Sequence, residues 1–434
     1  MERERFSSRL GLILATVGFA VGVGNFWRFP YITGVYGGGV FLAFYIVMVL
    51  LIGIPLLVAE MTLGKAAQKS PVGAYRVLSP GKPWYLNGYI HMIAAILIIS
   101  YTLPIYAWII HYFYKTLLGT FAGMGAAEIG AHFDGLIGNP GHVIFLAIIN
   151  LVLTLAVVLR KLQKGVERIA KILLPFLLLL IVILIIRGLT LPGAMEGVSF
   201  YLKPDFSVFT GEAALAAIGQ VFFSVGIVMA AAFVFGSYMK KEDSAQLIPN
   251  GILIALADTL AAFLAGFMIF PAVFAFGLEP SAGPGLVFVT MPNVFNLMPA
   301  GIFWGTIFYL GFYIAAFTSA VAVWEAMIAF FGDEFNFTRT KSALITLVLV
   351  VIIGFSSIIS MELFEFIDYL ENNFFLVFGA LFMTIFVGWV WGIDNFSREA
   401  AVKKESTKKL WAFLLKFLAP IIIIVLALNL FGIV

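Results

Sequence analysis

The sequence predicts an all-α membrane protein, a polytopic bundle of eleven transmembrane helices in a single domain, 1–434. Composition is the first reason, because 62% of the 434 residues are hydrophobic, 11% are charged and the mean hydropathy is +1.07. A soluble domain carries about 25% charged residues. The second reason is the number of apolar segments long enough to cross a bilayer, which takes about 20 residues. They lie near 10–30, 39–62, 88–117, 142–159, 170–188, 212–238, 247–275, 302–331, 342–360, 365–394 and 410–433.

The third reason is the distribution of basic residues along the chain. If the amino terminus is cytoplasmic, 21 of the 26 Lys and Arg residues lie in the inner segments 1–9, 65–86, 160–171, 239–246, 332–341 and 395–409. The outer connections 119–140, 277–299 and 361–364 contain none. This alternation follows the positive-inside rule and independently supports an odd number of spans. We therefore expect a multi-pass protein of the plasma membrane whose carboxyl terminus is extracellular.

Several functional classes are disfavoured by what the sequence lacks. It contains no cysteine, which excludes disulfides and thiol chemistry. Its net charge of +3 follows from topology, so no basic domain for nucleic acid is expected. No nucleophile–base pair or phosphate-binding loop is apparent, and the four histidines show no metal-ligand spacing. Those histidines are His91, His111, His132 and His142. We expect neither an enzyme nor an ATP-driven pump.

The first apolar segment contains "GFAVGVGNFWRFP", residues 18–30, which is poor helix-forming material. Its glycines allow the backbone to unwind, and Asn25 can offer an amide oxygen at the break. In lipid, an interrupted helix survives only where protein or a water-filled cavity satisfies its backbone groups. The freed N–H groups suit a carboxylate, and the freed carbonyl groups suit a small cation. Close helix packing through small residues is the alternative.

Five stretches of the chain resemble the neurotransmitter:sodium symporter family. They are "RLGLILATVGFAVGVGNFWRFP" (9–30), "GGGVFLAFYIVMVLLIGIPLLVAEMTLG" (37–64), "KGVERIAK" (164–171), "GQVFFSV" (219–225) and "FTSAVAVWEAMIAF" (317–330). The resemblance, which runs to about residue 395, implies a prokaryotic member with a LeuT-type fold. That fold has two inverted repeats of five helices, here about 9–190 and 212–395, and this chain adds a helix at about 410–433. Substrate and sodium are then expected near the midplane, beside breaks in spans 1 and 6. For span 6 the pattern offers one glycine, Gly226, where relatives often have more.

The resemblance implies two sodium sites. The first consists of Ala20, Asn25, Ser224 and Asp258, and the second of Gly18, Val21, Ala315, Thr318 and Ser319. Asp258 is a lone carboxylate at membrane depth, where a charge costs at least about 2.5–3.5 kcal/mol, so a cation or a proton is its natural partner. Thr318 and Ser319 share a helical face with the Ala315 carbonyl region, which forms an oxygen cluster suited to sodium. The alternatives are a protonated Asp258 bonded to a neighbouring helix and hydroxyls bonded back to the preceding turn.

Chloride-dependent relatives hold a negative ion near the first sodium site with Tyr, Gln and Ser groups. Tyr45, Gln220 and Ser224 match these groups, whereas the further Ser position is Ala262. Because Asp258 already supplies the negative charge, the resemblance predicts no chloride requirement.

The residues that the resemblance assigns to the substrate are mostly apolar and predict a hydrophobic or aromatic amino acid. They are Phe19, Ala20, Gly22, Gly24, Tyr101, Thr102, Phe223, Ser224, Gly226, Met229, Ser319 and Val323. Phe19 stands where relatives are often polar, and Thr102 stands where they place a substrate-contacting Tyr. The alternative is that the aromatic residues of this set lie in the core or face lipid, as aromatic residues at helical spacing more often do.

Two ion pairs are expected to gate the transport path. Arg28 and Asp368 resemble the family's outer gate, since a guanidinium at this depth needs a carboxylate or water. An Arg that reaches the lipid headgroups is the alternative. Arg3 and Asp333 match the inner pair, although Phe6 replaces the usual Trp. The alternative is that the basic residues at this end serve only to orient the chain in the membrane.

These expectations together predict a sodium-coupled symporter for a small amino acid-type solute that works by alternating access. The lipid bilayer and the solute are the expected partners, and the oligomeric state is not predicted. A non-transporting amino acid sensor, a channel-like protein or a sodium-independent transporter of the same fold are the alternatives.

Overall fold

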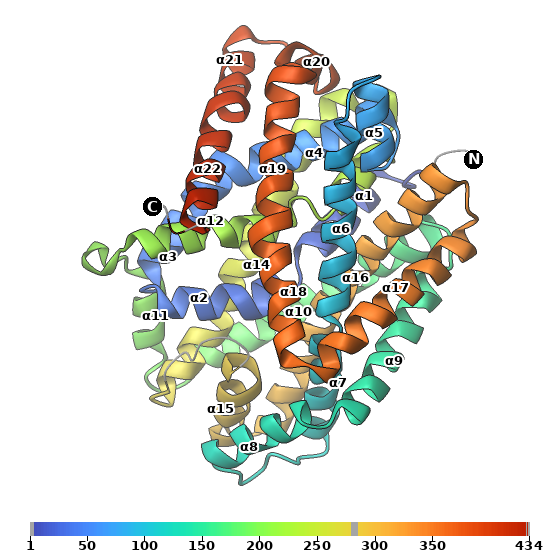
Figure 1. Ribbon diagram of the computed structural model, residues 1–434. Helices are drawn as coiled ribbons and strands as arrows, with labels where there is room; N and C mark the ends of the chain where they lie inside the picture. Colours follow the sequence, from blue (N-terminus) through green and yellow to red (C-terminus); the bar gives the residue numbers. More distant parts are fainter. Residues whose placement is uncertain (1–3, 279–284, 431, 433–434) are drawn as a thin grey trace.

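The computed structural model describes residues 4–278, 285–430 and 432, and all regular structure in this part of the chain is helical (Figure 1). The first half contains α1 (Arg9–Ala20), η1 (Gly24–Arg28), α2 (Phe29–Val35), α3 (Gly39–Met48), η2 (Val49–Gly53), α4 (Ile54–Ala67), α5 (Pro71–Leu78), α6 (Tyr85–Tyr101), α7 (Leu103–Leu117), α8 (Ala126–Ile137), α9 (Pro140–Val158), η3 (Gln163–Glu167), α10 (Arg168–Leu189), α11 (Ala194–Leu202) and η4 (Phe206–Val208). The second half contains α12 (Gly211–Val225), α13 (Ala231–Ser237), η5 (Lys241–Asp243), α14 (Ser244–Ala275), η6 (Leu286–Thr290), α15 (Met291–Leu297), α16 (Gly301–Phe335), α17 (Arg339–Ile359), α18 (Met361–Leu370), η7 (Glu371–Phe375), α19 (Leu376–Ile385), η8 (Phe386–Val390), α20 (Ile393–Glu399), α21 (Glu405–Phe413), η9 (Leu414–Leu418) and α22 (Ala419–Leu430).

Within the described residues, nine helices are long and apolar enough to cross a membrane, or ten if the bent pair at the start of the chain is one span. That pair is α1 and the η1–α2 segment, which meet at an angle of 48°. The predicted span 212–238 is divided into α12 and α13, and neither piece is long enough by itself. The expected number of eleven is therefore not confirmed by helix length and composition.

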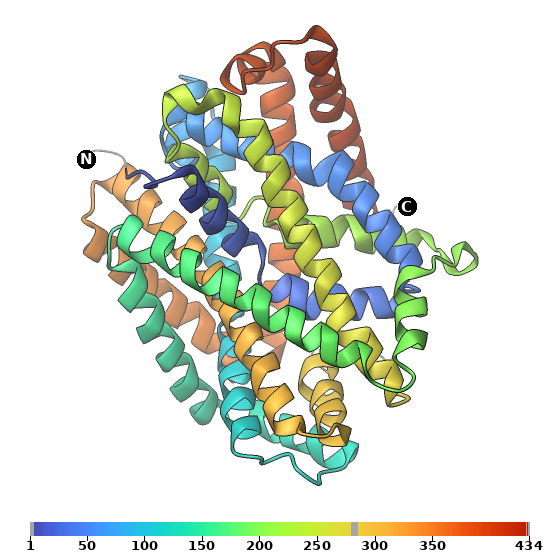
Figure 2. The ribbon, with the colours of Figure 1, turned by 180° about the vertical axis from the view of Figure 1, so that it is seen from behind.

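Helix α16 lies at the centre of the bundle (Figures 1 and 2). Protein buries 94% of its most apolar 18-residue stretch. This helix contacts α1, α6, α7, α10 and α17. By contrast, only 33% and 39% of the most apolar 18-residue stretches are buried in the spans that contain α10 and α17. Large apolar side chains on these helices, such as Leu179 and Ile352, are exposed. Such faces are stable only against lipid, so they mark the outside of the bundle.

Helices α4 and α13 cross at very close range through two glycines. A Cβ atom at Gly64 would overlap the backbone carbonyl of Phe233, and one at Gly236 would overlap that of Met61. Small residues allow helix backbones to approach this closely in membrane proteins. The short helix α13 is thereby fixed against α4, next to the residues that join it to α12.

Candidate functional site

The first helix is interrupted at residues 21–23, which we call the first break. Val21 is extended (φ −76°, ψ 97°), and its N–H makes the last helical bond, of 2.7 Å, to the Val17 carbonyl. The next N–H, of Gly22, donates to the Asn25 Oδ1 atom at 2.9 Å, so it does not continue the helical ladder to Gly18. The Asn25 side chain thus accepts the N–H that would otherwise bond to the Gly18 carbonyl, and that carbonyl loses its helical partner.

The glycines at the first break also permit close contacts. A Cβ atom at Gly22 would lie 2.9 Å from the Ser319 Cβ atom, and one at Gly24 would lie 2.9 Å from the Phe223 ring. Unwinding and close packing, offered as alternatives by the sequence, therefore occur together at this place.

A second break occupies residues 226–230, between α12 and α13. Gly226, Val228 and Ala230 have positive φ angles of 71°, 71° and 62°. The Val228 N–H donates to the Glu60 Oε1 atom at 2.6 Å, and the Glu60 side chain is fully buried on α4. His91 lies behind this carboxylate, with its Nδ1 atom 3.5 Å from Oε1. Sequence reasoning missed Glu60, although a lone acid inside an apolar span was an available signal.

Three residues assigned to the first sodium site come together between the two breaks. The Ser224 hydroxyl donates to the Asp258 carboxylate, with Oγ 2.9 Å from Oδ2 and 3.1 Å from Oδ1. The Asn25 Nδ2 atom lies 2.8 Å from Asp258 Oδ1 and 3.3 Å from Ser224 Oγ. Asn25, Ser224 and Asp258 are at most 2% exposed, and Ala20, the last residue of α1, is 5% exposed.

The side-chain oxygens of this cluster come from Asp258 and Ser224. The Asp258 carboxylate is surrounded by the neutral groups Asn25, Ser224 and Tyr45. A buried carboxylate without a cationic side chain suits a bound monovalent cation. The Asn25 side chain lies in the cluster, but its oxygen accepts from Gly22, so its nitrogen and not its oxygen faces the carboxylate.

The residues of the second predicted sodium site lie where α1 crosses α16. A Cβ atom at Gly18 would lie 3.5 Å from the Thr318 Cβ atom, and one at Gly22 would lie 3.9 Å from the Ala315 carbonyl oxygen. The Thr318 hydroxyl donates back to its own helix, 3.0 Å from the Ile314 carbonyl and 3.1 Å from that of Ala315. The structure thus juxtaposes the two elements but shows the Thr318 hydroxyl in its alternative role.

The groups that match a chloride site lie beside Asp258. The Tyr45 hydroxyl and the Gln220 Oε1 atom are buried without a hydrogen-bond partner among the described atoms. Gln220 Nε2 donates to the Gly24 carbonyl at 3.3 Å. Ala262 is fully buried on α14 and adds no hydroxyl.

The predicted substrate residues are distributed over several elements around the breaks. The Phe19 ring packs directly on Gly226, so it joins the first break to the second. The Tyr101 hydroxyl accepts from Asn372 Nδ2 at 3.4 Å, which places it at the outer gate. Thr102 lies between α6 and α7, and its hydroxyl bonds back to the Ile98 carbonyl. Met229 is buried in the second break, Val323 is buried on α16, and Phe223 is half-buried on α12.

The predicted outer gate is connected through a residue that the sequence did not single out. Arg28 Nη1 donates to Asn372 Oδ1 at 2.8 Å, and Asn372 Nδ2 donates to Asp368 Oδ1 at 2.9 Å. The guanidinium also lies 4.6 Å from the centre of the Phe223 ring. Asn372 therefore bridges Arg28 and Asp368, and we call this group of four residues the outer gate.

At the opposite end, the predicted inner gate is only partly described, because Arg3 lies outside the described residues. The Asp333 carboxylate accepts from the Ser70 N–H at 2.6 Å and lies 3.8 Å from Lys69 Nζ. Phe6 packs edge-on against Phe235 with ring centres 5.5 Å apart.

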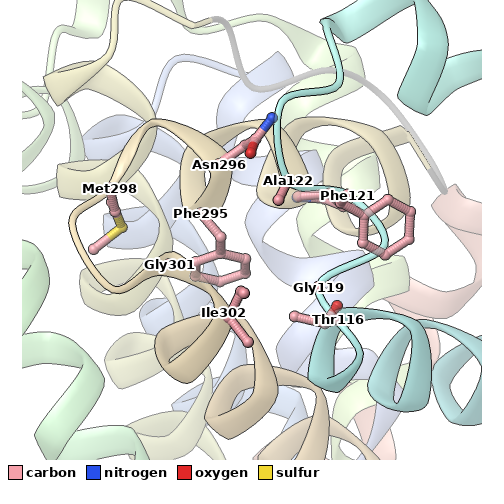
Figure 3. Close-up of a pocket in the computed structure, with 10 residues that line it drawn as sticks. Thr116, Gly119, Phe121, Ala122, Phe295, Asn296, Met298, Gly301 and Ile302 are labelled. Carbon is pink, nitrogen blue, oxygen red and sulfur yellow. The ribbon is translucent and has the colours of Figure 1, made fainter.

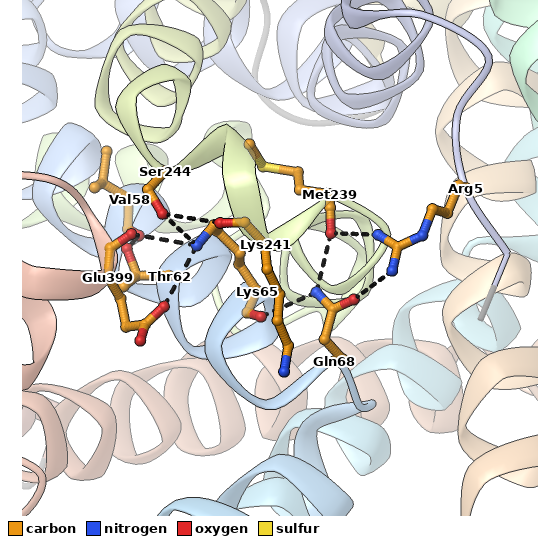
Figure 4. A network of polar contacts seen from close by, with 9 residues as sticks. All are labelled: Arg5, Val58, Thr62, Lys65, Gln68, Met239, Lys241, Ser244 and Glu399. Atoms are coloured by element: carbon orange, nitrogen blue, oxygen red, sulfur yellow. Dashed lines mark hydrogen bonds and ion pairs between the residues drawn. The ribbon is translucent and has the colours of Figure 1, made fainter. Parts of the chain in front are cut away.

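Further polar contacts tie the elements together at this end (Figure 4). Arg5 donates to the Met239 carbonyl at 2.8 Å and to Gln68 Oε1 at 3.1 Å. Lys65 is 1% exposed and donates to Ser244 Oγ at 2.7 Å. Its Nζ atom also lies 3.3 Å from the Glu399 carboxylate. These contacts connect the amino-terminal segment and the end of α4 with α14, α20 and Met239, which lies two residues beyond α13.

Three of the four histidines meet near the end of the bundle where α8 and α15 lie, one each from α7, α8 and α9. His111 Nε2 lies 2.8 Å from His132 Nε2, and His111 Nδ1 lies 3.0 Å from His142 Nε2. Among the described residues, no group of three or more His, Cys, Asp or Glu side chains could hold a metal ion. Burial, with a smaller effect from Lys115, lowers the pKa of His132, which lies outside the membrane-spanning helices.

A cavity of about 150 Å³ opens near this end, between the end of α7 and the α15–α16 connection (Figure 3). Thr116, Phe295, Asn296 and Ile302 are among its lining residues. None of the predicted site residues lines it, so it is separate from the two breaks.

Comparison with known proteins points to one family. The model described as "Sodium:neurotransmitter symporter family" matches residues 3–124 and 128–433. YhdH, a sodium-dependent transporter of Bacillus subtilis strain 168, is 34% identical, over 99% of this chain and 98% of its own. The human sodium- and chloride-dependent creatine transporter 1 is 27% identical, over 92% of this chain and 72% of its own. The crystal structure of MhsT in complex with L-phenylalanine is 38% identical with a TM-score of 0.90, covering 98% of this chain and 99% of MhsT.

Proposed function

Because the chain belongs to the sodium:neurotransmitter symporter family and is a multi-pass, sodium-dependent membrane transporter, we propose that it moves a hydrophobic or aromatic amino acid together with sodium. The observation that carries the proposal is the buried cluster of Asn25, Ser224 and Asp258 between two helix breaks. One carboxylate surrounded by neutral donors is a place for a monovalent cation.

In the proposed mechanism, sodium enters as a transported ion and neutralises Asp258. The first break presents backbone N–H groups, which suit the carboxylate of an amino acid. Solute and sodium bound side by side raise each other's affinity by the same factor, and this reciprocity couples their transport. Gly18, Val21, Ala315, Thr318 and Ser319 are proposed to bind a second sodium ion. The Thr318 oxygen keeps lone pairs for this ion while its hydrogen stays bonded to a carbonyl of its own helix.

The proposed solute class rests on the apolar side chains near the breaks. Phe19, Phe223, Met229 and Val323 favour a hydrophobic or aromatic side chain over a charged one. MhsT, which is 38% identical and was crystallised with L-phenylalanine, supports the same class. Thr102 lacks a phenol, and the Tyr101 hydroxyl is turned towards the outer gate. We therefore propose that backbone groups of the first break make most of the contacts with the solute carboxylate.

We propose that transport needs no added chloride. The supporting observation is that Asp258 already brings a negative charge to the place where Tyr45, Gln220 and Ser224 gather. Sodium-driven uptake is expected to continue at an unchanged rate when gluconate replaces chloride on both sides of proteoliposomes. A severalfold fall in rate would contradict this proposal.

The test of the proposed function is uptake by purified protein in proteoliposomes. An inward sodium gradient should drive accumulation of a radiolabelled amino acid from a panel of aliphatic, aromatic and charged candidates, and that amino acid should stimulate flux of radioactive sodium. Binding without accumulation would indicate a sensor. Solute flux that does not need sodium would indicate a channel-like or sodium-independent protein.

A separate experiment in intact cells tests the proposed orientation, with the amino terminus in the cytoplasm and the carboxyl terminus outside. The distribution of Lys and Arg supports it. A protease-sensitive tag at the carboxyl terminus should be cleaved in intact cells, whereas one at the amino terminus should be protected.

A further inference from the structure

Glu371, the first residue of η7, is a buried acid that the proposed function does not use. Its side chain is 0% exposed, and neither of its carboxyl oxygens has a hydrogen-bond partner among the described atoms. An ionised carboxylate without partners is costly to bury, and even more so at membrane depth. The residue is therefore neutral in this arrangement, or a cation has to reach it.

The groups that face Glu371 leave it without a cation of its own. Asp368, one turn earlier, and Arg28, from the opposite side of the outer gate, are the charged groups that act on it. The Tyr101 hydroxyl, on α6, lies near both acids. The Arg28 guanidinium is already bonded to Asn372, which in turn holds Asp368. Two ionised acids would share one guanidinium here, which leaves one excess negative charge.

The local backbone places both acids on the same side of the helix. Asp368 and Glu371 are three residues apart, a spacing that puts side chains on one helical face. Glu371 opens a π-helical turn, residues 371–375, which packs against α6.

We propose that Glu371 is a positioning residue of the outer gate, carrying a proton while Asn372 connects Arg28 to Asp368 and releasing it when η1 and α18 separate. Separation admits water to the carboxyl group, and hydration favours its charged form. Closure takes one proton from solution, and opening returns that proton. High pH should therefore favour the open gate, and low pH the closed one. The inference needs a gate that opens but does not depend on which solute is carried.

The absence of cysteine allows a direct test in intact cells. Ser319→Cys places the sole thiol on α16 against Gly22. The proposal requires that an external reagent reach this thiol faster when the gate is open. Ala127→Cys, exposed on α8, reports how the reagent itself responds to pH. The labelling ratio is the rate at which a membrane-impermeant methanethiosulfonate labels Ser319→Cys, divided by its rate for Ala127→Cys. We expect this ratio to rise roughly fivefold or more from about pH 5.5 to about 8.5. A labelling ratio that stays constant over this range would overturn the proposal. This first test needs no substitution of Glu371.

The assignment to Glu371 is tested in the same Ser319→Cys background. Glu371→Gln, a permanently neutral side chain, should hold the labelling ratio at its low-pH value throughout. Glu371→Asp should restore the rise, and Glu362→Gln, an exposed position on α18, should behave like the parent. If Glu371→Gln keeps the full pH dependence, or Glu371→Asp abolishes it, another group takes up the proton and the proposal is wrong. Neither labelling experiment needs a known solute. A failure of this proposal can therefore be distinguished from a failure of the proposed transport function.

Discussion

The charge of Asp258 decides what the cluster of Asn25, Ser224 and Asp258 can bind. The two neutral residues orient the carboxylate but cannot balance it, because amide and hydroxyl dipoles are weaker than a full positive charge. A cation that enters the cluster gains the whole of this attraction in a place from which water is excluded. The strength of sodium binding should therefore depend on this carboxylate more than on its neighbours.

The first prediction is that Asp258→Asn weakens sodium binding by at least about tenfold, a loss of about 1.4 kcal/mol. The change keeps the shape of the side chain and removes its charge. The measurement is the sodium concentration that gives half of the sodium-induced rise in the heat-denaturation midpoint of the purified protein. Asp394→Asn, which removes an exposed carboxylate paired with Lys408, is the control and should leave that concentration unchanged. Equal sodium dependence in both variants would exclude Asp258 from the site.

Single residues with unusual chemistry were the part of the site most open to prediction from sequence. Asn25 and Asp258 stand out because a polar group in an apolar span needs a reason, and the structure brings them together with Ser224. Asn372 and Glu371 were not predicted, because their roles depend on which face of α18 and η7 meets Arg28. That face is set by packing between distant helices, which a single sequence does not encode in any local pattern.

At the scale of elements, the two helix breaks have different physical origins. The first contains its own cause, since glycines and Asn25 favour unwinding and the Asn25 side chain closes the turn. The second contains Val228 and Ala230 with positive φ, a conformation that side chains with a Cβ atom rarely adopt. It is stabilised from outside by Glu60, on another helix. This explains why the sequence pattern indicated the first break clearly and offered only Gly226 for the second.

The second prediction concerns Glu60, which accepts the Val228 N–H at the second break. Glu60→Leu should destabilise the protein by roughly 1–3 kcal/mol, because a buried N–H loses its partner. Glu60→Gln keeps an acceptor oxygen and should recover most of the stability. The measurement is heat denaturation of the purified protein in detergent, at constant sodium. If Leu and Gln give the same midpoint, the hydrogen bond to Val228 contributes nothing to the break.

At the scale of the whole molecule, the end of the bundle with α8 and α15 contains the histidine cluster that joins three helices. The pKa of His132 is lowered, first by burial and then by Lys115, so the unfolded chain takes up a proton at a higher pH than the folded chain. The contribution of His132 to stability is thus complete above its ordinary pKa of about 6.5 and is lost as the pH falls below that value.

The third prediction follows from this pH dependence. Lowering the pH from about 8 to about 5.5 should reduce the heat-denaturation midpoint more in the parent protein than in His132→Gln, which cannot gain the proton. Asp134→Asn, an exposed change on the same helix α8, should follow the parent. Parallel pH curves for the parent and His132→Gln would show that His132 has no part in the effect.

Alternating access requires that the other end of the bundle also opens, and there a buried ion pair joins α16 and α17. Arg339 Nη2 lies 2.5 Å from the fully buried Glu325 carboxylate, which also accepts from the Tyr238 hydroxyl at 2.9 Å. Arg339 reaches Glu4 as well, at 3.3 Å, and so connects the amino-terminal segment to α16 and α17. Removing only the cation leaves Glu325 buried without compensation, which typically costs about 3–5 kcal/mol.

The fourth prediction is that Arg339→Gln shifts the molecule towards the conformation that is open at this end, because water entering there relieves the unpaired charge of Glu325. A thiol at Ser319→Cys should then be labelled faster from this side, in membrane vesicles whose sidedness has been established, and more slowly from the other side. Lys341→Gln removes an exposed cation two residues away and should change neither rate. A rise in labelling from both sides would instead indicate general loosening of the fold, and unchanged rates would show that the Arg339–Glu325 pair does not hold this end closed.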